Sequence, residues 1–271
     1  MRSPDGPATL GRDTARARLT SRRSFLKVAA ATGAVATLYA APRFSSFGPK
    51  PAYASITGVI PCLSFIDFDT IGGLGAGDKI GTNNSGLQPW SAFGVTVETL
   101  LRDQSAFHPY GAMIFNSAIP TGSDADLRTP SITGGIDNTV ARFNVLIISE
   151  DGVSSPITGP TGGPDDDAAG GVIVFQFNTP RKLTSIGLLD IDLNEGGNSG
   201  IQTRISAYNT APDLTVSTAD HVGDLISSAF DVTGLGNNSW QTVPFVRAGV
   251  RELRIRFRNS GAIGRIDFDC L

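Results

Sequence analysis

Aspartate is the residue type that gives this chain its clearest chemistry. Residues 55–271 contain 19 Asp and four Glu, many of them in polar segments between apolar runs. Ca²⁺ takes about six to eight oxygen ligands from carboxylates, carbonyls and water on flexible loops, so such clusters predict a calcium site. The candidate ligands are Asp67, Asp124, Asp126, Glu150, Asp151, Asp165, Asp166, Asp167, Asp190, Asp192 and Asp267. The alternative for each cluster is a set of solvated turn residues.

Other catalytic chemistry has little support in the sequence. His108 and His221 are the only histidines, which argues against zinc or iron held by histidine. No Gly-x-Ser-x-Gly turn, phosphate-binding loop or dinucleotide-binding fingerprint is present. We therefore expect no catalytic residues and treat a glycoside hydrolase built on two carboxylates as the enzymatic alternative.

A glycan-binding surface needs an exposed aromatic ring, and two residues are candidates for it. Trp90 follows Gln88-Pro89 and is expected to be exposed, and Tyr110 lies in another turn-like segment. Trp240, by contrast, begins an apolar run and is expected in the core. Packing in the core or at a sheet edge is the alternative for Trp90 and Tyr110.

The apolar pattern predicts an all-β protein. Residues 172–177 form an almost continuous apolar run, and residues 253–258 alternate apolar side chains with three arginines. Clusters of Gly, Pro, Asn and Asp separate such runs, as expected for turns. We therefore expect residues 55–271 to form one antiparallel, jelly-roll-like β-sandwich, with the aspartate clusters in its loops.

The two cysteines, Cys62 and Cys270, each flank a copy of the same tetrapeptide, residues 66–69 and 266–269. A sandwich usually brings its terminal strands together, so the sequence predicts a disulfide between them. Two free, buried thiols are the alternative.

Charge limits the classes of partner. The whole chain has a formal net charge of −3, but residues 55–271 hold 13 basic and 23 acidic side chains, a net charge of −10. Nucleic-acid binding depends on clustered positive charge, so we expect no nucleic-acid partner. An acidic domain suits extracellular solubility and divalent cations.

The segment Ser21-Arg22-Arg23-Ser24-Phe25-Leu26-Lys27 resembles a twin-arginine export signal. The apolar run at residues 28–41 is too short for a stable membrane span. The resemblance implies export of the folded chain by the twin-arginine machinery to the periplasm or the extracellular space. Ala52-Tyr53-Ala54 has the form read by signal peptidase, so we expect cleavage after Ala54, with a cut near Ala40 as the alternative.

Four segments, in order, resemble a family of exported bacterial domains found in proteins with a PEP-CTERM sorting tail. They are AMIFNS (112–117), PTGSDADLRTP (120–130), NVLIISED (144–151) and SIGLLDID (185–192), and the likeness covers roughly residues 64–269. The family is similar to carbohydrate-binding jelly rolls. The resemblance implies that fold, and a shared metal-binding rim formed by Asp124, Asp126, Glu150, Asp151 and Asp165 to Asp167.

Together these patterns predict an exported calcium-binding β-sandwich that acts without catalysis. Its expected role is glycan binding or adhesion in the cell envelope or outside the cell, with a glycan or envelope polymer as partner. The alternatives are the carboxylate-dependent glycoside hydrolase and a purely structural envelope protein.

Overall fold

The structure is a computed structural model that describes residues 62–71, 73–81, 85–121, 124–154, 163–193, 203–210 and 224–270. All of these residues belong to the unit Ser55–Leu271. The expected signal segment, residues 1–54, and its cleavage site lie outside the described residues. Within the described ranges, no helix is long and apolar enough to cross a membrane.

The expected all-β fold is confirmed. The described residues form ten strands and two short 3₁₀ helices, η2 (Ser91–Phe93) and η3 (Ala125–Leu127). The strands are β1 (Phe65–Asp67), β2 (Lys79–Ile80), β3 (Val95–Leu100), β4 (Ala112–Asn116), β5 (Asn144–Ile148), β6 (Gly171–Leu189), β7 (Arg204–Tyr208), β8 (Phe230–Asp231), β9 (Trp240–Phe257) and β10 (Ala262–Cys270). Every pair of neighbouring strands is antiparallel.

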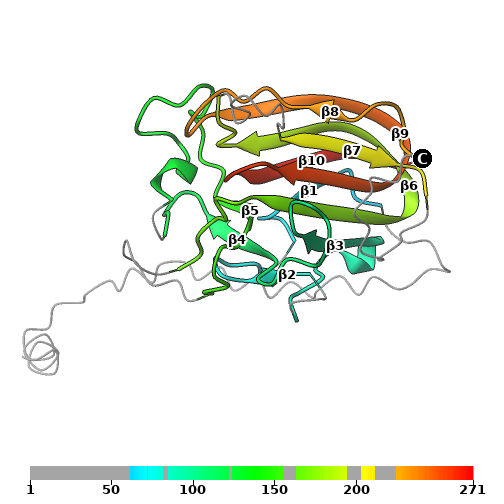
Figure 1. Cartoon of the computed structure of the whole chain (residues 1–271), viewed down its shortest axis with the longest axis horizontal. Coiled ribbons are helices and arrows are strands. Elements are labelled where there is room, and N and C mark those ends of the chain that lie inside the picture. The colour runs from blue at the N-terminus through cyan, green and yellow to red at the C-terminus, as the bar shows by residue number, and fades with distance from the viewer. Residues whose placement is uncertain are drawn as a thin grey trace, which may run out of the picture. The chain divides into compact units, whose positions relative to one another are not determined.

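One hydrogen-bonded sheet contains all ten strands. Its order is β2-β4-β5-β10-β6-β9-β7-β8, with β1 beside β10 and β3 beside β6. The long strand β6 pairs with β9 along one edge, while its other edge is shared by β3 and then β10 (Figure 1). Register shifts in the β6–β9 pair mark bulges, where twist and bending increase. The antiparallel architecture agrees with expectation, and jelly-roll connectivity stays a prediction.

Strands β4 and β5 are buried on both faces. Along β4, Ile114 joins the main core, whereas Phe115 joins a second core that includes Leu127 and Trp240. Burial on both faces explains why these strands read as continuous apolar runs instead of alternating ones. Because Leu127 ends η3, the second core also fastens the loop that carries Asp124 and Asp126 to the sheet.

The terminal strands lie together as the sequence predicts. β1 pairs with β10 so that Ile66 faces Ile266, and Cys62 and Cys270 form a disulfide with a Cα–Cα distance of 6.2 Å. The predicted disulfide is confirmed. It links the two ends of the described chain across 208 positions of sequence.

The two tryptophans are both in the interior. Trp240 is buried in the second core, as expected. The expectation that Trp90 is exposed is wrong, because Trp90 has no exposed surface and packs edge-on against Phe68, with ring centroids 5.6 Å apart. Because it is fully buried, this indole offers no surface platform.

Candidate metal centre

Four loop segments meet at one end of the sheet, and the first three of them carry aspartates. They are residues 124–127 between β4 and β5, 165–167 before β6, 190–192 after β6 and 236–239 before β9. Since β5 and β6 each pair antiparallel with β10, their carboxyl ends lie at the same edge. The partner of Leu189 in β9 is Trp240, which brings the start of β9 to that edge as well.

Three carboxylates come closest together there. Asp124, Asp165 and Asp166 each offer an oxygen, and the three oxygens lie within 4.8 Å of one another. Asp124 and Asp166 are buried, and Asp165 is half-buried. Such close, desolvated carboxylates repel one another unless protons or a cation compensate the charge.

Asp124 is turned toward the centre by its place in the loop. It is the N-cap residue of η3, yet its carboxylate makes no capping hydrogen bond. Instead, its Oδ2 accepts the backbone N–H of Asp166 at 2.8 Å. Thr121 fixes the same two segments to each other, because its hydroxyl donates to the Pro164 carbonyl at 2.9 Å.

Asp166 is held by the turn that precedes β10. Its Oδ2 accepts the backbone N–H of Gly261 at 2.7 Å. Gly261 has a φ of +146°, a conformation that side chains rarely adopt, and a Cβ there would lie 3.0 Å from atoms of Ile191 and Phe257. Asp166 also continues the sheet beyond β5 through an isolated bridge to Ser149.

Burial and mutual repulsion raise the pKa values of carboxyl groups in this cluster. Burial, followed by the nearby charge of Asp166, raises the pKa of Asp124 to about 10. Burial raises the pKa of Asp166 to about 7, although the Gly261 N–H opposes the shift. Burial also raises the pKa of Asp126, with further contributions from Asp192 and Asp165. In the absence of a cation, the cluster therefore retains protons near neutral pH.

Three further aspartates surround these carboxylates. Asp126 and Asp192 repel each other, and Asp190 and Asp126 both repel Asp166. Asn238 ties this outer group together, because its backbone N–H donates to Asp190 Oδ1 and its side-chain amide donates to the Asp126 carbonyl. Asp190 and Asn238 both adopt positive φ, +63° and +55°, which Asp and Asn tolerate better than most residues.

The donor set fits a hard divalent cation. Carboxylate oxygens from several loops are the ligands that Ca²⁺ prefers, and their spacing permits more than one to bind one ion. Among the described residues, no Lys, Arg or His forms an ion pair with Asp124, Asp165 or Asp166. The loops therefore bring together negative charge that the described side chains do not neutralise.

The other predicted ligands lie outside this group. Glu150 is exposed at its rim, where slight desolvation and then repulsion from Asp165 raise the pKa of Glu150. Asp151 is exposed and accepts the backbone N–H of Val153 at 2.8 Å. Asp167 turns away to His108, with Nε2 and Oδ2 2.9 Å apart.

Asp67 and Asp267 are half-buried residues of the paired strands β1 and β10. Asp67 accepts hydrogen bonds from the Thr70 N–H and hydroxyl, at 2.8 and 2.6 Å. Asp267 pairs with Arg265 at 2.7 Å and accepts the Ser185 hydroxyl at 2.8 Å. Local partners thus satisfy both carboxylates, and neither is in the group of three.

Two residues of the candidate metal centre were not predicted from the sequence. Asn238 and Gly261 carry no charge, and each follows other turn-forming residues, Gly236-Asn237 and Asn259-Ser260. That pattern signals a turn but gives no indication of which carboxylate the turn meets. Only the strand pairing, which brings the starts of β9 and β10 to the end of β6, places them here.

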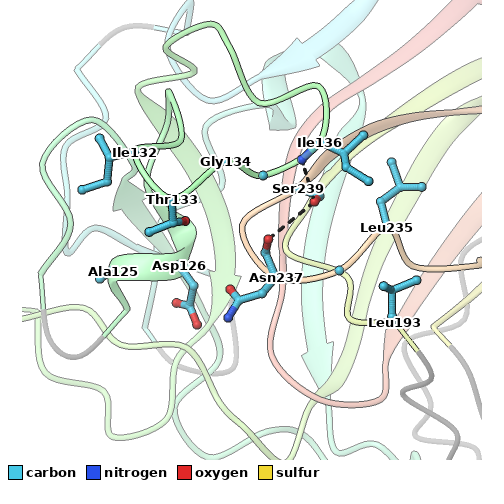
Figure 2. A pocket seen from close by; sticks show the side chains of 12 residues that line it. Ala125, Asp126, Ile132, Thr133, Gly134, Ile136, Leu193, Leu235, Asn237 and Ser239 are labelled. Atoms are coloured by element: carbon cyan, nitrogen blue, oxygen red, sulfur yellow. Dashed lines mark hydrogen bonds between the residues drawn. The ribbon is translucent and has the colours of Figure 1, made fainter.

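A pocket of about 650 Å³ adjoins the centre (Figure 2). Asp126, Thr133, Asn237 and Ser239 supply its polar side chains, and isoleucine and leucine residues supply much of the remaining wall. Tyr110 does not line it. Tyr110 is 41% exposed and lies edge-on to His108, with ring centroids 6.2 Å apart.

Comparison with known proteins identifies one segment of the chain. Residues 20–39 match the model of the twin-arginine translocation pathway signal sequence. The chain carries a twin-arginine export signal. This directs it to the twin-arginine machinery and out of the cytoplasm. The chain has no match among curated proteins and none among solved structures.

Export should depend on the paired arginines. Replacing Arg22 and Arg23 with lysine keeps the charge but removes the guanidinium pair, so we expect the precursor to accumulate in the cytoplasm. Cell fractionation with immunoblotting measures this, and N-terminal sequencing of the exported form tests cleavage after Ala54. Undiminished export of the double lysine variant would show that another route is used.

Proposed function

We propose that this protein is an exported, non-enzymatic, calcium-binding module of the periplasm or extracellular space. The observation that carries the proposal is the convergence of Asp124, Asp165 and Asp166, whose oxygens lie within 4.8 Å of one another. A cation shared by these carboxylates would join the loop at 124–127 to the segment at 165–167. It would thereby stabilise one end of the sheet.

Carboxylate spacing favours this role over glycoside hydrolysis. Hydrolytic carboxylate pairs stand roughly 5–9.5 Å apart, which leaves room for a sugar or a water between them. One oxygen from each of Asp124, Asp165 and Asp166 lies within 4.8 Å of the others, which leaves little room for a sugar between these side chains. Two of the three side chains are also buried, which suits an enclosed ion better than a polymer chain.

The proposed partner is a molecule of the envelope or its surroundings. The sequence points to a glycan, but the buried Trp90 offers no ring for stacking, and Tyr110 alone remains as an exposed candidate. The pocket beside Asp126 is the better-formed ligand surface, because it is concave and lies beside the acidic loops (Figure 2). Adhesion or ligand retention by this face is therefore the role that we propose.

Calcium should stabilise the purified protein. A ligand that binds only the native state adds about 2.7 kcal/mol at a hundredfold excess over its dissociation constant. In a domain of this size we expect a rise in melting temperature of roughly 5–10 °C. Differential scanning calorimetry in calcium and in chelator measures it. Asp166→Asn should abolish the rise, whereas Asp137→Asn, at an exposed position, should retain it. An unchanged melting temperature in the unmodified protein would contradict the proposal.

The effect of calcium should increase with pH. Asp124 and Asp166 have pKa values raised above 3.8, so the calcium-free native state binds more protons than the unfolded state. Their contribution to stability is complete below pH 3.8 and is lost as the pH rises through the raised pKa values. Calcium replaces these protons. The calcium-dependent rise in melting temperature should therefore be larger at pH 8 than at pH 5, and an equal or smaller rise at pH 8 would contradict this.

A further inference from the structure

The pocket beside the metal centre has an unusual wall for a surface depression. Ile132, Ile136 and Leu193 line it and remain 70%, 51% and 61% exposed. Leu235 lines it as well. Clustered exposed aliphatic side chains are costly in water and mark a surface that a ligand covers. Among the residues that the structure describes, the lining includes no aromatic ring.

The wall of the pocket is anchored to β9. The Ile136 N–H donates to the Ser239 hydroxyl at 3.0 Å (Figure 2). The Ile136 carbonyl accepts the Trp240 N–H at 2.9 Å. Gly135 passes so close to the Asn238 carbonyl that a Cβ would overlap it. These contacts hold residues 135 and 136 against the start of β9, so this part of the wall is preorganised.

Among the described lining residues, one is ionisable. It is Asp126, whose side chain extends into the pocket near Asn237 (Figure 2). Asp165 and Asp192 lie close enough to act on it electrostatically. No lysine or arginine is among the lining residues in the described part of the chain. The described lining thus combines an aliphatic wall with one carboxylate, and its occupant should have an aliphatic body and a positive end.

We propose that this pocket binds an aliphatic primary ammonium, with its methylene chain against Ile132, Ile136 and Leu193 and its nitrogen paired with Asp126. An ammonium group has three N–H donors, which the Asp126 carboxylate and the Asn237 side-chain oxygen can accept. The inference rests on the proposed function only in treating the protein as a binding module, because a cation at the metal centre is not required. A free alkylamine and the lysine side chain of a protein partner share this chemistry.

The test uses matched probes on the full chain. The dissociation constants of n-hexylammonium and of neutral 1-hexanol are measured by calorimetry and by NMR shifts of the Ile132, Ile136 and Leu193 methyl groups. Nα-acetyl-lysine N-methylamide serves as the lysine arm. We expect hexylammonium to bind at least about tenfold more tightly than hexanol, since a charge-assisted hydrogen bond adds to the apolar contact. Asp126→Asn should remove that preference, while Asp137→Asn, on the same loop but outside the lining, should keep it.

The outcomes separate this inference from the calcium proposal. Each titration is run with calcium and with chelator. Selective hexylammonium binding without any calcium binding would support the pocket and overturn the metal centre, and calcium binding alone would do the reverse. Binding of the lysine amide together with hexylammonium would identify a lysine-bearing partner, and binding of hexylammonium alone a free amine. Equal affinity for hexanol, an unaffected Asp126→Asn variant or absent methyl shifts would overturn the inference.

Discussion

Replacing Cys62 and Cys270 with serine is expected to lower the free energy of unfolding by about 5 kcal/mol. The disulfide closes a loop of 208 positions, and chain entropy in the unfolded state gives a cross-link of that length roughly this contribution. The bond also holds β1, which has only three residues paired with β10. Arg181 donates hydrogen bonds to both sulfur atoms, so the reduced protein should retain a polar contact at this place.

Chemical denaturation of the oxidised, reduced and double serine proteins measures this loss. The reduced and serine forms should unfold at similar denaturant concentrations, since both lack the cross-link. Their free energy of unfolding should fall more steeply with denaturant concentration, because an unfolded chain without the disulfide exposes more surface. A difference below about 1 kcal/mol from the oxidised protein would contradict the prediction.

Substituting methionine for Arg254 is expected to cost about 3–5 kcal/mol, the usual penalty for removing one partner of a buried ion pair. Arg254 Nε lies 2.6 Å from Glu252 Oε1, and both side chains are almost fully buried. Arg254 also donates to Gln104 and lies over the Tyr208 ring, 5.3 Å from its centroid. The variant would leave Glu252 as a buried charge without its cation.

A double variant separates the interaction from simple loss of packing. Combining Arg254→Met with Glu252→Leu removes both charges, so we expect it to be more stable than Arg254→Met alone. Denaturant unfolding of the two single variants and the double variant completes the cycle. Additive losses would show that the two charges do not stabilise each other.

The burial of the Arg254–Glu252 pair also shows what the alternation of apolar residues cannot predict. The alternation at residues 253–258 correctly predicts that Leu253, Ile255 and Phe257 enter the core. It gives no sign that Arg254 is buried on the opposite face. On that face, the segment after β3 covers the sheet. Its Gln104 accepts a hydrogen bond from Arg254, and its Phe107 packs against a small core that includes Leu100. Periodicity reports one face of a strand, and the covering of the other face depends on tertiary contacts.

The candidate metal centre, too, could be predicted only in part from the sequence. Aspartate clusters in the loops were evident from composition, but neighbours in sequence are not all neighbours in the centre. Asp165 and Asp166 face Asp124, whereas Asp167 meets His108. Strand pairing decides which loops share one end of the sheet, and Asn238 enters only for that reason. The prediction that Trp90 is exposed is wrong for a related reason, since a turn pattern does not determine the direction of a side chain.

The most direct test of the metal centre is a calcium titration of chelator-treated protein by isothermal calorimetry at pH 8. We predict saturable binding to the native chain, and a loss of that binding in the Asp124→Asn and Asp166→Asn variants. The Asp137→Asn protein should bind as the unmodified chain does. Absence of a binding isotherm, together with no calcium in elemental analysis of protein purified without chelator, would contradict the account.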